Sequence, residues 1–307
     1  TNHGLYATLY SFPAMMKRNL MKGSVIPRYS GLPTVLKENG YYNLFFMTHE
    51  GQYDNMNAFF RTNGYDEVFS QEDYPADKVV NSFGVQDDFL YDYAIPVLNQ
   101  RAATGQPFFA TLLSISNHPP YVIPPFFHPK TSEPETQIVE YADWALRQFF
   151  EEARKQPWFD NTIFVLEGDH GKLVGDAECE LPESYNHIPL MIYSSRIQPE
   201  EKTTFGGQVD IQPTILGLLN IDYLQNNFGV DLLKEERPCM FYTADNMVVG
   251  RNDTLLYLYN YETQQELTYD IGNGKLNAVP MDDSFLPLKE YSFSMLQSAE
   301  FLVKHGK

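Results

Sequence analysis

The chain has 307 residues, of which 43% are hydrophobic and 15% aromatic, enough for one large α/β domain with a smaller appendage. Asp and Glu number 40 against 22 Lys and Arg, which gives a formal charge of −18. Such an acidic surface repels phosphate backbones and excludes nucleic acid as an expected partner. An anionic membrane surface is also a poor docking site unless the charge lies away from it.

The first predicted elements are helices that alternate with buried strands. A helix from about Thr34 ends at Asn39-Gly40, and the apolar strand 42–47 follows it. "DDFLYDYAIPVLNQRA" has apolar residues at helical spacing, and residues 108–115 form a second apolar strand. "TQIVEYADWALRQFFEEARKQ" then predicts a strongly amphipathic helix.

The same alternation continues to about residue 236. Residues 162–166 and "HIPLMIYSS" are predicted strands, and "VDIQPTILGLLNI" is a helix with Pro213 near its first turn. Strands that alternate with helices predict a largely parallel, layered sheet. From about Arg237 the chain is tyrosine-rich and punctuated by turns, which predicts a small antiparallel subdomain at 237–307 with a final helix near 291–304.

The two cysteines, Cys179 and Cys239, are too few for a disulfide framework. One bridge in an oxidising compartment and two unpaired thiols both remain open. No apolar stretch is as long as a membrane helix, and there is no signal peptide. Because the chain starts at Thr1 rather than at methionine, we expect it to be a piece of a longer protein, whose anchors lie outside it.

Three predicted strands end in polar pairs: Thr48-His49, Asn117-His118 and Asp169-His170. If the strands are parallel, their carboxyl ends share one edge, where α/β proteins bind ligands. His187 precedes its strand and needs a loop or an antiparallel strand to reach that edge. One such histidine alone is best explained as a hydrogen-bonded loop residue, but the group favours a functional cleft.

Asp169 and His170 offer the oxygen and nitrogen ligands that suit zinc or manganese. On a regular strand these neighbours would face opposite ways, but Gly168 and Gly171 let both turn toward one ion. No G-x-S-x-G elbow, phosphate loop, H-E-x-x-H or paired C-x-x-C is present. A Ser-His-Asp triad has no local support, although composition does not exclude it.

"TIFVLEGDHG", "NHIPLMIYSS" and "GQVDIQPTILGLLNI", in this order, resemble the sulfatase branch of the alkaline phosphatase superfamily. The chain is most similar to the lipoteichoic acid synthase and phosphoglycerol transferase group, which "TNHGLYATLYSFP", "FFMTHEGQYDNMNAFFRTNGYD" and "LLSISNHPPY" also fit. The similarity runs from Thr1 to about Leu233. It implies an α/β sandwich around a large, mostly parallel sheet, with residues 1–236 as the catalytic domain and a small antiparallel α+β subdomain after it.

The resemblance implies a divalent metal (manganese, magnesium or zinc) bound by Asp169 and His170, and Thr1 as nucleophile and further ligand. A threonine hydroxyl is a weak nucleophile at neutral pH, and a metal is one of few ways to activate it. The predicted helix after Thr1 would favour a phosphorylated intermediate at its N-terminus.

The resemblance also assigns the substrate side of the site. His49, Asp54 and Asn55 would line the headgroup side, although a helix cap explains Asp54 and Asn55 equally well. His118 would contact the phosphoryl oxygens or protonate the leaving alkoxide. His187 would hold phosphate or a second, weaker metal.

Two departures from the family pattern matter. The family's first strand, with its acidic metal ligand, would lie upstream of Thr1, so we expect weak or no metal binding and no activity from this chain alone. The C/S-x-P-x-R motif of classical sulfatases is absent, which argues against a true sulfatase.

The expected activity is therefore phosphoglycerol transfer or phosphodiester cleavage in the cell envelope. The donor would be a glycerophospholipid headgroup and the acceptor a glycan or polyol, on the outer face of the cytoplasmic membrane or in the periplasm. Transmembrane helices upstream of Thr1 would anchor the intact protein. A sulfate or phosphate ester hydrolase and a catalytically silent envelope binding domain are the alternatives.

Overall fold

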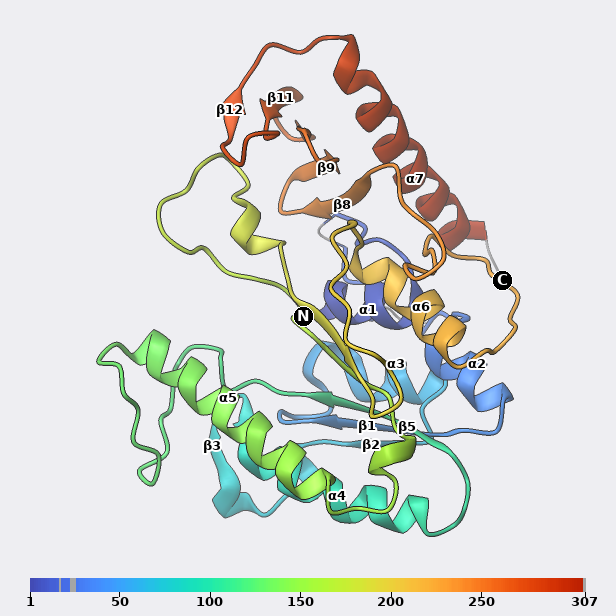
Figure 1. The fold of residues 1–307 in the computed structure, drawn as a ribbon, viewed down its shortest axis with the longest axis vertical. Coiled ribbons are helices and arrows are strands. Elements are labelled where there is room, and N and C mark those ends of the chain that lie inside the picture. Colours follow the sequence, from blue (N-terminus) through green and yellow to red (C-terminus); the bar gives the residue numbers. More distant parts are fainter. Residues whose placement is uncertain (17, 23–25, 306–307) are drawn as a thin grey trace.

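The structure, a computed structural model, describes residues 1–16, 18–22 and 26–305 (Figure 1). The helices are α1 (Asn2–Tyr10), α2 (Leu32–Glu38), α3 (Met56–Thr62), α4 (Asp87–Ala102), α5 (Pro134–Ala153), α6 (Ile211–Leu218) and α7 (Leu286–His305). The strands are β1 (Tyr42–Met47), β2 (Glu67–Phe69), β3 (Val79–Asn81), β4 (Gly84–Val85), β5 (Phe108–Leu113), β6 (Phe164–Glu167), β7 (Leu190–Tyr193), β8 (Met240–Ala244), β9 (Met247–Arg251), β10 (Leu255–Asn260), β11 (Gln265–Asp270) and β12 (Asn277–Ala278).

The central sheet is parallel and has the order β2-β1-β5. Side chains of β1 alternate between two cores: Phe45 and Met47 pack on one face of the sheet, and Leu44 and Phe46 on the other. These four side chains are fully buried. Burial on both faces explains the apolar run from Leu44 to Met47, whereas the buried Asn43 side chain donates to Pro33 O and Gly64 O. The predicted strand 42–47 is confirmed.

Helices cover both faces of this sheet (Figure 1). α4 and α5 pack with Leu44 and Phe46, whereas α1, α2, α3 and α6 pack with Phe45 and Met47. The predicted amphipathic helix is α5, whose buried residues recur at a spacing of three or four: Ile138, Tyr141, Ala145, Phe149 and Ala153. This arrangement is the layered α/β architecture that the alternating pattern predicts.

β6 departs from the expectation that the three strands ending in polar pairs are parallel neighbours. Within the described residues it pairs only with β7, and that pairing is antiparallel. It still continues the layer, because Phe164 packs in the core of α4 and α5 and Val165 in the opposite core. The loop after β6 therefore begins between the two cores and carries Asp169 and His170.

The C-terminal part is an antiparallel sheet with the order β12-β11-β10-β9-β8, as predicted. α7 packs on it and is longer than the predicted helix 291–304.

Cys179 and Cys239 are both free thiols, so of the two possibilities left open by the sequence, two unpaired thiols are observed. No helix in the described part of the chain is long and apolar enough to cross a membrane. The exact domain boundary at residue 237 stays a prediction.

Candidate active site

Thr1 precedes α1 as its N-cap residue, but its side chain makes no capping hydrogen bond. The first turn is closed by the backbone, with Leu5 N donating to Thr1 O at 3.0 Å. The Thr1 hydroxyl is therefore not used for capping. The backbone nitrogen of Thr1 lies 3.6 Å from Asp169 Oδ2, which brings together residues from the start of the chain and from the loop after β6.

The hydrogen bonds of His170 determine which of its nitrogens is free. Nδ1 lies 2.8 Å from Gly171 O, and because a carbonyl only accepts, Nδ1 carries the proton. In the neutral ring Nε2 then carries the lone pair, and this atom lies 3.7 Å from Asp169 Oδ2. Two electron-rich atoms at this separation are stabilised by a cation between them, and a histidine whose other nitrogen donates to a carbonyl is a common metal ligand.

The donor set fits part of a divalent metal site. Asp169, His170 and the Thr1 hydroxyl supply two oxygens and one nitrogen, which suit manganese or zinc. Glu167 adds a buried carboxylate whose Oε2 has no hydrogen-bond partner. Burial, and secondarily the nearby Asp169 carboxylate, raise the pKa of Glu167 to about 7. No group of three or more His, Cys, Asp and Glu in the described residues is arranged as a metal site.

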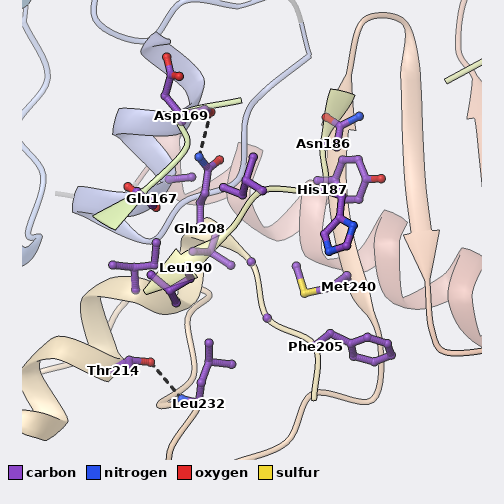
Figure 2. Close-up of a pocket in the computed structure, with 18 of the residues that line it drawn as sticks. Glu167, Asp169, Asn186, His187, Leu190, Phe205, Gln208, Thr214, Leu232 and Met240 are labelled. Atoms are coloured by element: carbon purple, nitrogen blue, oxygen red, sulfur yellow. Dashed lines mark hydrogen bonds between the residues drawn. The ribbon is translucent and has the colours of Figure 1, made fainter. Parts of the chain in front are cut away.

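These residues open on one large cavity of about 1410 Å³, lined by Thr1, Glu167, Asp169, His170 and His187 among others. Figure 2 shows Glu167 and Asp169 on one side of this space and Asn186 and His187 on the other. Apolar side chains line the cavity as well: Leu190, Phe205, Leu232 and Met240. His187 reaches the cavity from the segment before β7, an antiparallel strand, which is one of the two routes expected for it.

Asp54 and Asn55 lie close to the start of α1 but outside the cavity lining. Asn2 Nδ2 donates to Asp54 Oδ2 at 3.0 Å, and Lys22 Nζ pairs with Asp54 Oδ1 at 2.5 Å. Asn55 is the N-cap residue of α3, as the capping alternative expects, but its side chain donates to Met21 O and makes no capping hydrogen bond.

The backbone of the same two residues is strained. Asp54 and Asn55 have φ values of 49° and 62°, a costly pair of left-handed conformations for residues that are not glycine. Asp54 is charged and accepts a hydrogen bond from Asn2, the residue after Thr1. The role of Asp54 and Asn55 at the substrate headgroup stays a prediction.

The convergence of His49 and His118 on the Asp169 cleft stays a prediction. Neither lines the large cavity, and His118 lines a separate small hollow with its ring 4.2 Å from that of Phe83. β1 and β5 are paired with each other, whereas β6 is not paired with either strand in the described residues. Their roles at the substrate stay predictions.

The three strand-end histidines nevertheless share one local arrangement. In each, Nδ1 contacts the carbonyl of the next residue: His49 with Glu50 at 3.1 Å, His118 with Pro119 at 2.7 Å and His170 with Gly171 at 2.8 Å. Each ring therefore keeps Nε2 as the acceptor nitrogen. His49 Nε2 is buried and has no partner, so it has a free lone pair.

His49 predicts a specific dependence of stability on pH. Burial lowers its folded-state pKa below the 6.5 of the unfolded chain. Below pH 6.5 the unfolded state therefore binds more protons, and folding stability is lost as pH falls toward the folded pKa. In urea unfolding of the metal-free protein between about pH 7.5 and pH 5, His49→Asn should lose less stability than the parent protein. An equal loss in both proteins would contradict this, and the exposed His128→Asn is the control.

His3 and Gln208 also line the cavity, and neither is among the predicted site residues. His3 Nε2 lies 3.2 Å from Arg18 O, and burial lowers its pKa. Because His3 is only two residues after the predicted nucleophile Thr1, its place in the sequence indicates that it lies near the site. Gln208 Nε2 donates to the carbonyls of Gly168 and Asp169, and no local sequence pattern predicts that contact.

Comparisons with known proteins identify the family and the fold of this chain. The Sulfatase family model matches residues 1–221. The chain belongs to the Sulfatase family. A solved structure of a protein in the alkaline phosphatase superfamily from Vibrio parahaemolyticus superposes with a TM-score of 0.86 at 27% identity, and the match covers 98% of this chain and 76% of that one. The alkaline phosphatase-like fold is thereby confirmed.

Named relatives in this family point to the predicted group. Lipoteichoic acid synthase 1 of Bacillus subtilis is 26% identical over 270 residues, which make up 80% of this chain and 40% of the relative. Phosphoglycerol transferase I of Xanthomonas campestris is 25% identical over 242 residues, 75% of this chain and 34% of the relative. The crystal structure of the lipoteichoic acid synthase LtaP from Listeria monocytogenes shares the fold, with a TM-score of 0.84 at 22% identity over 99% of this chain and 80% of that one. The chain thus spans two fifths or less of these two curated relatives.

Proposed function

We propose that this Sulfatase-family chain is the catalytic domain of a metal-dependent phosphoglycerol transferase or phosphodiesterase of the cell envelope. The observation that carries the proposal is the pair of Asp169 Oδ2 and His170 Nε2, 3.7 Å apart beside Thr1 in a large cavity. Relatives named lipoteichoic acid synthase and phosphoglycerol transferase support the reaction class.

In the proposed first step, Thr1 Oγ1 forms a bond to the phosphorus of a glycerophospholipid headgroup. The bond from phosphorus to the diacylglycerol oxygen breaks, Thr1 loses its hydroxyl proton, and the leaving oxygen gains a proton. The bound metal would lower the pKa of the hydroxyl and neutralise charge on the phosphoryl oxygens. The N-terminus of α1 favours the phosphate that is then carried by Thr1.

In the second step, the oxygen of a glycan or polyol hydroxyl, or of water, forms a bond to phosphorus. The bond from phosphorus to Thr1 Oγ1 breaks, the attacking hydroxyl loses its proton, and the Thr1 oxygen regains one. His187 lines the opposite side of the cavity, where it would hold the anionic phosphoryl group or its polar substituent. Asn2 and Asp54 hold the start of α1, so that the Thr1 oxygen keeps its position between the two steps. His118 as the proton donor to the leaving oxygen stays a separate prediction.

A substrate panel with metal removal tests this function. With Mn²⁺ present, the intact protein should release diacylglycerol from phosphatidylglycerol, and chelation of the metal should stop the release. Aryl phosphate and aryl sulfate should be turned over more slowly. Preferred turnover of aryl sulfate would instead support an ester hydrolase, and no turnover of any substrate would support a silent binding domain.

A further inference from the structure

Gln208 lies beside the backbone of the loop that carries the two proposed metal ligands. Its side-chain Nε2 donates to Gly168 O at 3.1 Å and to Asp169 O at 2.9 Å, and Figure 2 shows Gln208 reaching toward Asp169. A side-chain amide nitrogen carries two hydrogens, so one glutamine can satisfy both carbonyls. Two consecutive peptide groups are thereby fixed immediately before His170.

A second contact reaches the same carbonyl from α1. A Cβ built on Gly4 would lie 2.3 Å from Asp169 O and 3.0 Å from Gln208 Nε2, so only glycine permits this approach. The helix that begins at Thr1 and the turn that holds Gln208 therefore meet at the backbone of Asp169. This junction sets the distance between the proposed nucleophile and the proposed ligands.

The turn that carries Gln208 is itself held firmly. It is the short 3-10 segment η6 (Gln208–Asp210), in which Gly207 N donates to Asp210 Oδ2 at 2.9 Å. Asp210 is fully buried and forms an ion pair with the buried Arg237. Gln208 is thus attached to a rigid part of the core, whereas Asp169 and His170 lie in a loop open to the cavity.

We propose that Gln208 is a positioning residue, which holds Asp169 and His170 in the orientation that binds the metal by fixing the loop backbone. It touches neither a ligand side chain nor the metal position in this role. The inference rests on the proposed metal site. Residues that orient metal ligands typically contribute about 10- to 100-fold to affinity, which gives the expected size of the effect.

The test is the Mn²⁺ affinity of the intact protein, measured by calorimetry. Gln208→Met keeps the length of the side chain but removes both donors, and its Kd for Mn²⁺ should rise about 10- to 100-fold. Gln198 lines the same cavity without a contact to Asp169, so Gln198→Met is the matched control and should bind as the parent does. An unchanged Kd in Gln208→Met, or an equal rise in both variants, would overturn the inference.

A second variant separates positioning from a direct ligand role and from general destabilisation. Gln208→Glu places a carboxylate against two carbonyl oxygens, so a positioning residue predicts weaker Mn²⁺ binding again, whereas a direct ligand predicts tighter binding. In EDTA, the melting temperatures of both variants should lie well above the temperature of the titration, so that both proteins are folded when Mn²⁺ is added. If the parent protein does not bind Mn²⁺, the proposed metal site fails together with this inference. If the parent binds and both Gln208 variants bind equally well, only the inference fails.

Discussion

Replacing Thr1 by alanine is expected to lower phosphoglycerol transfer by at least about a thousandfold in the intact protein, because removal of a covalent nucleophile leaves only binding and electrostatic effects. The Thr1 side chain makes no capping hydrogen bond, so its loss should cost little folding stability. Kinetic assays with phosphatidylglycerol and Mn²⁺ measure the effect. The drop should appear in kcat rather than in KM, since the bond is made only during reaction.

The matched variant is Thr1→Ser, which keeps a hydroxyl at the same position. It should retain a substantial share of the transfer activity, and both variants should melt at the temperature of the parent protein in EDTA. Transfer by Thr1→Ala at the parent rate would remove Thr1 from the mechanism. Equal losses in both variants would show that the methyl group, not the hydroxyl, is what matters.

Replacing Arg237 by methionine is expected to lower the free energy of unfolding by about 3–5 kcal/mol, the range for breaking a buried ion pair. Arg237 and Asp210 are almost completely buried, and Arg237 Nε lies 2.9 and 2.8 Å from the two Asp210 oxygens. Without the guanidinium, the donors left to the Asp210 carboxylate in the described part of the chain are the backbone N–H groups of Gly207 and Val230. Urea unfolding measures the change.

The control is Arg147→Met, which breaks the exposed pair with Asp143 on α5. Exposed pairs contribute about 0–1 kcal/mol, so this variant should be close to the parent protein. A cost for Arg237→Met no larger than that of the control would contradict a structural role for the pair. Because Asp210 closes the turn of Gln208, loss of Arg237 should also weaken Mn²⁺ binding.

Regular elements with strong local patterns are predicted well from this sequence. β1 has the predicted limits because the apolar run Leu44–Met47 is buried on both faces of the sheet. α4 spans the predicted stretch, and α5 follows its amphipathic spacing. Pairing is harder: nothing in residues 162–166 indicates that β6 pairs antiparallel with β7, since a buried strand is apolar in either arrangement.

In the candidate site, too, local sequence patterns predict some residues, whereas others depend on contacts between distant parts of the chain. Asp169 and His170 are predictable because acid, histidine and glycines follow an apolar run. His49 and His118 fit that pattern equally well but do not line the cavity, and no local pattern distinguishes them from His170. Gln208 was missed because it acts through a contact 39 residues away in the chain, made by a side chain with no distinctive chemistry.

The most direct test of the central claim is a search for phosphoglycerol on Thr1. Intact protein would be mixed with phosphatidylglycerol and Mn²⁺ without an acceptor, stopped in acid within one turnover and analysed by peptide mass spectrometry. We predict an adduct of one phosphoglycerol group on the peptide that contains Thr1, absent when the metal is chelated. Release of diacylglycerol on the same timescale with no adduct on Thr1 would contradict the mechanism.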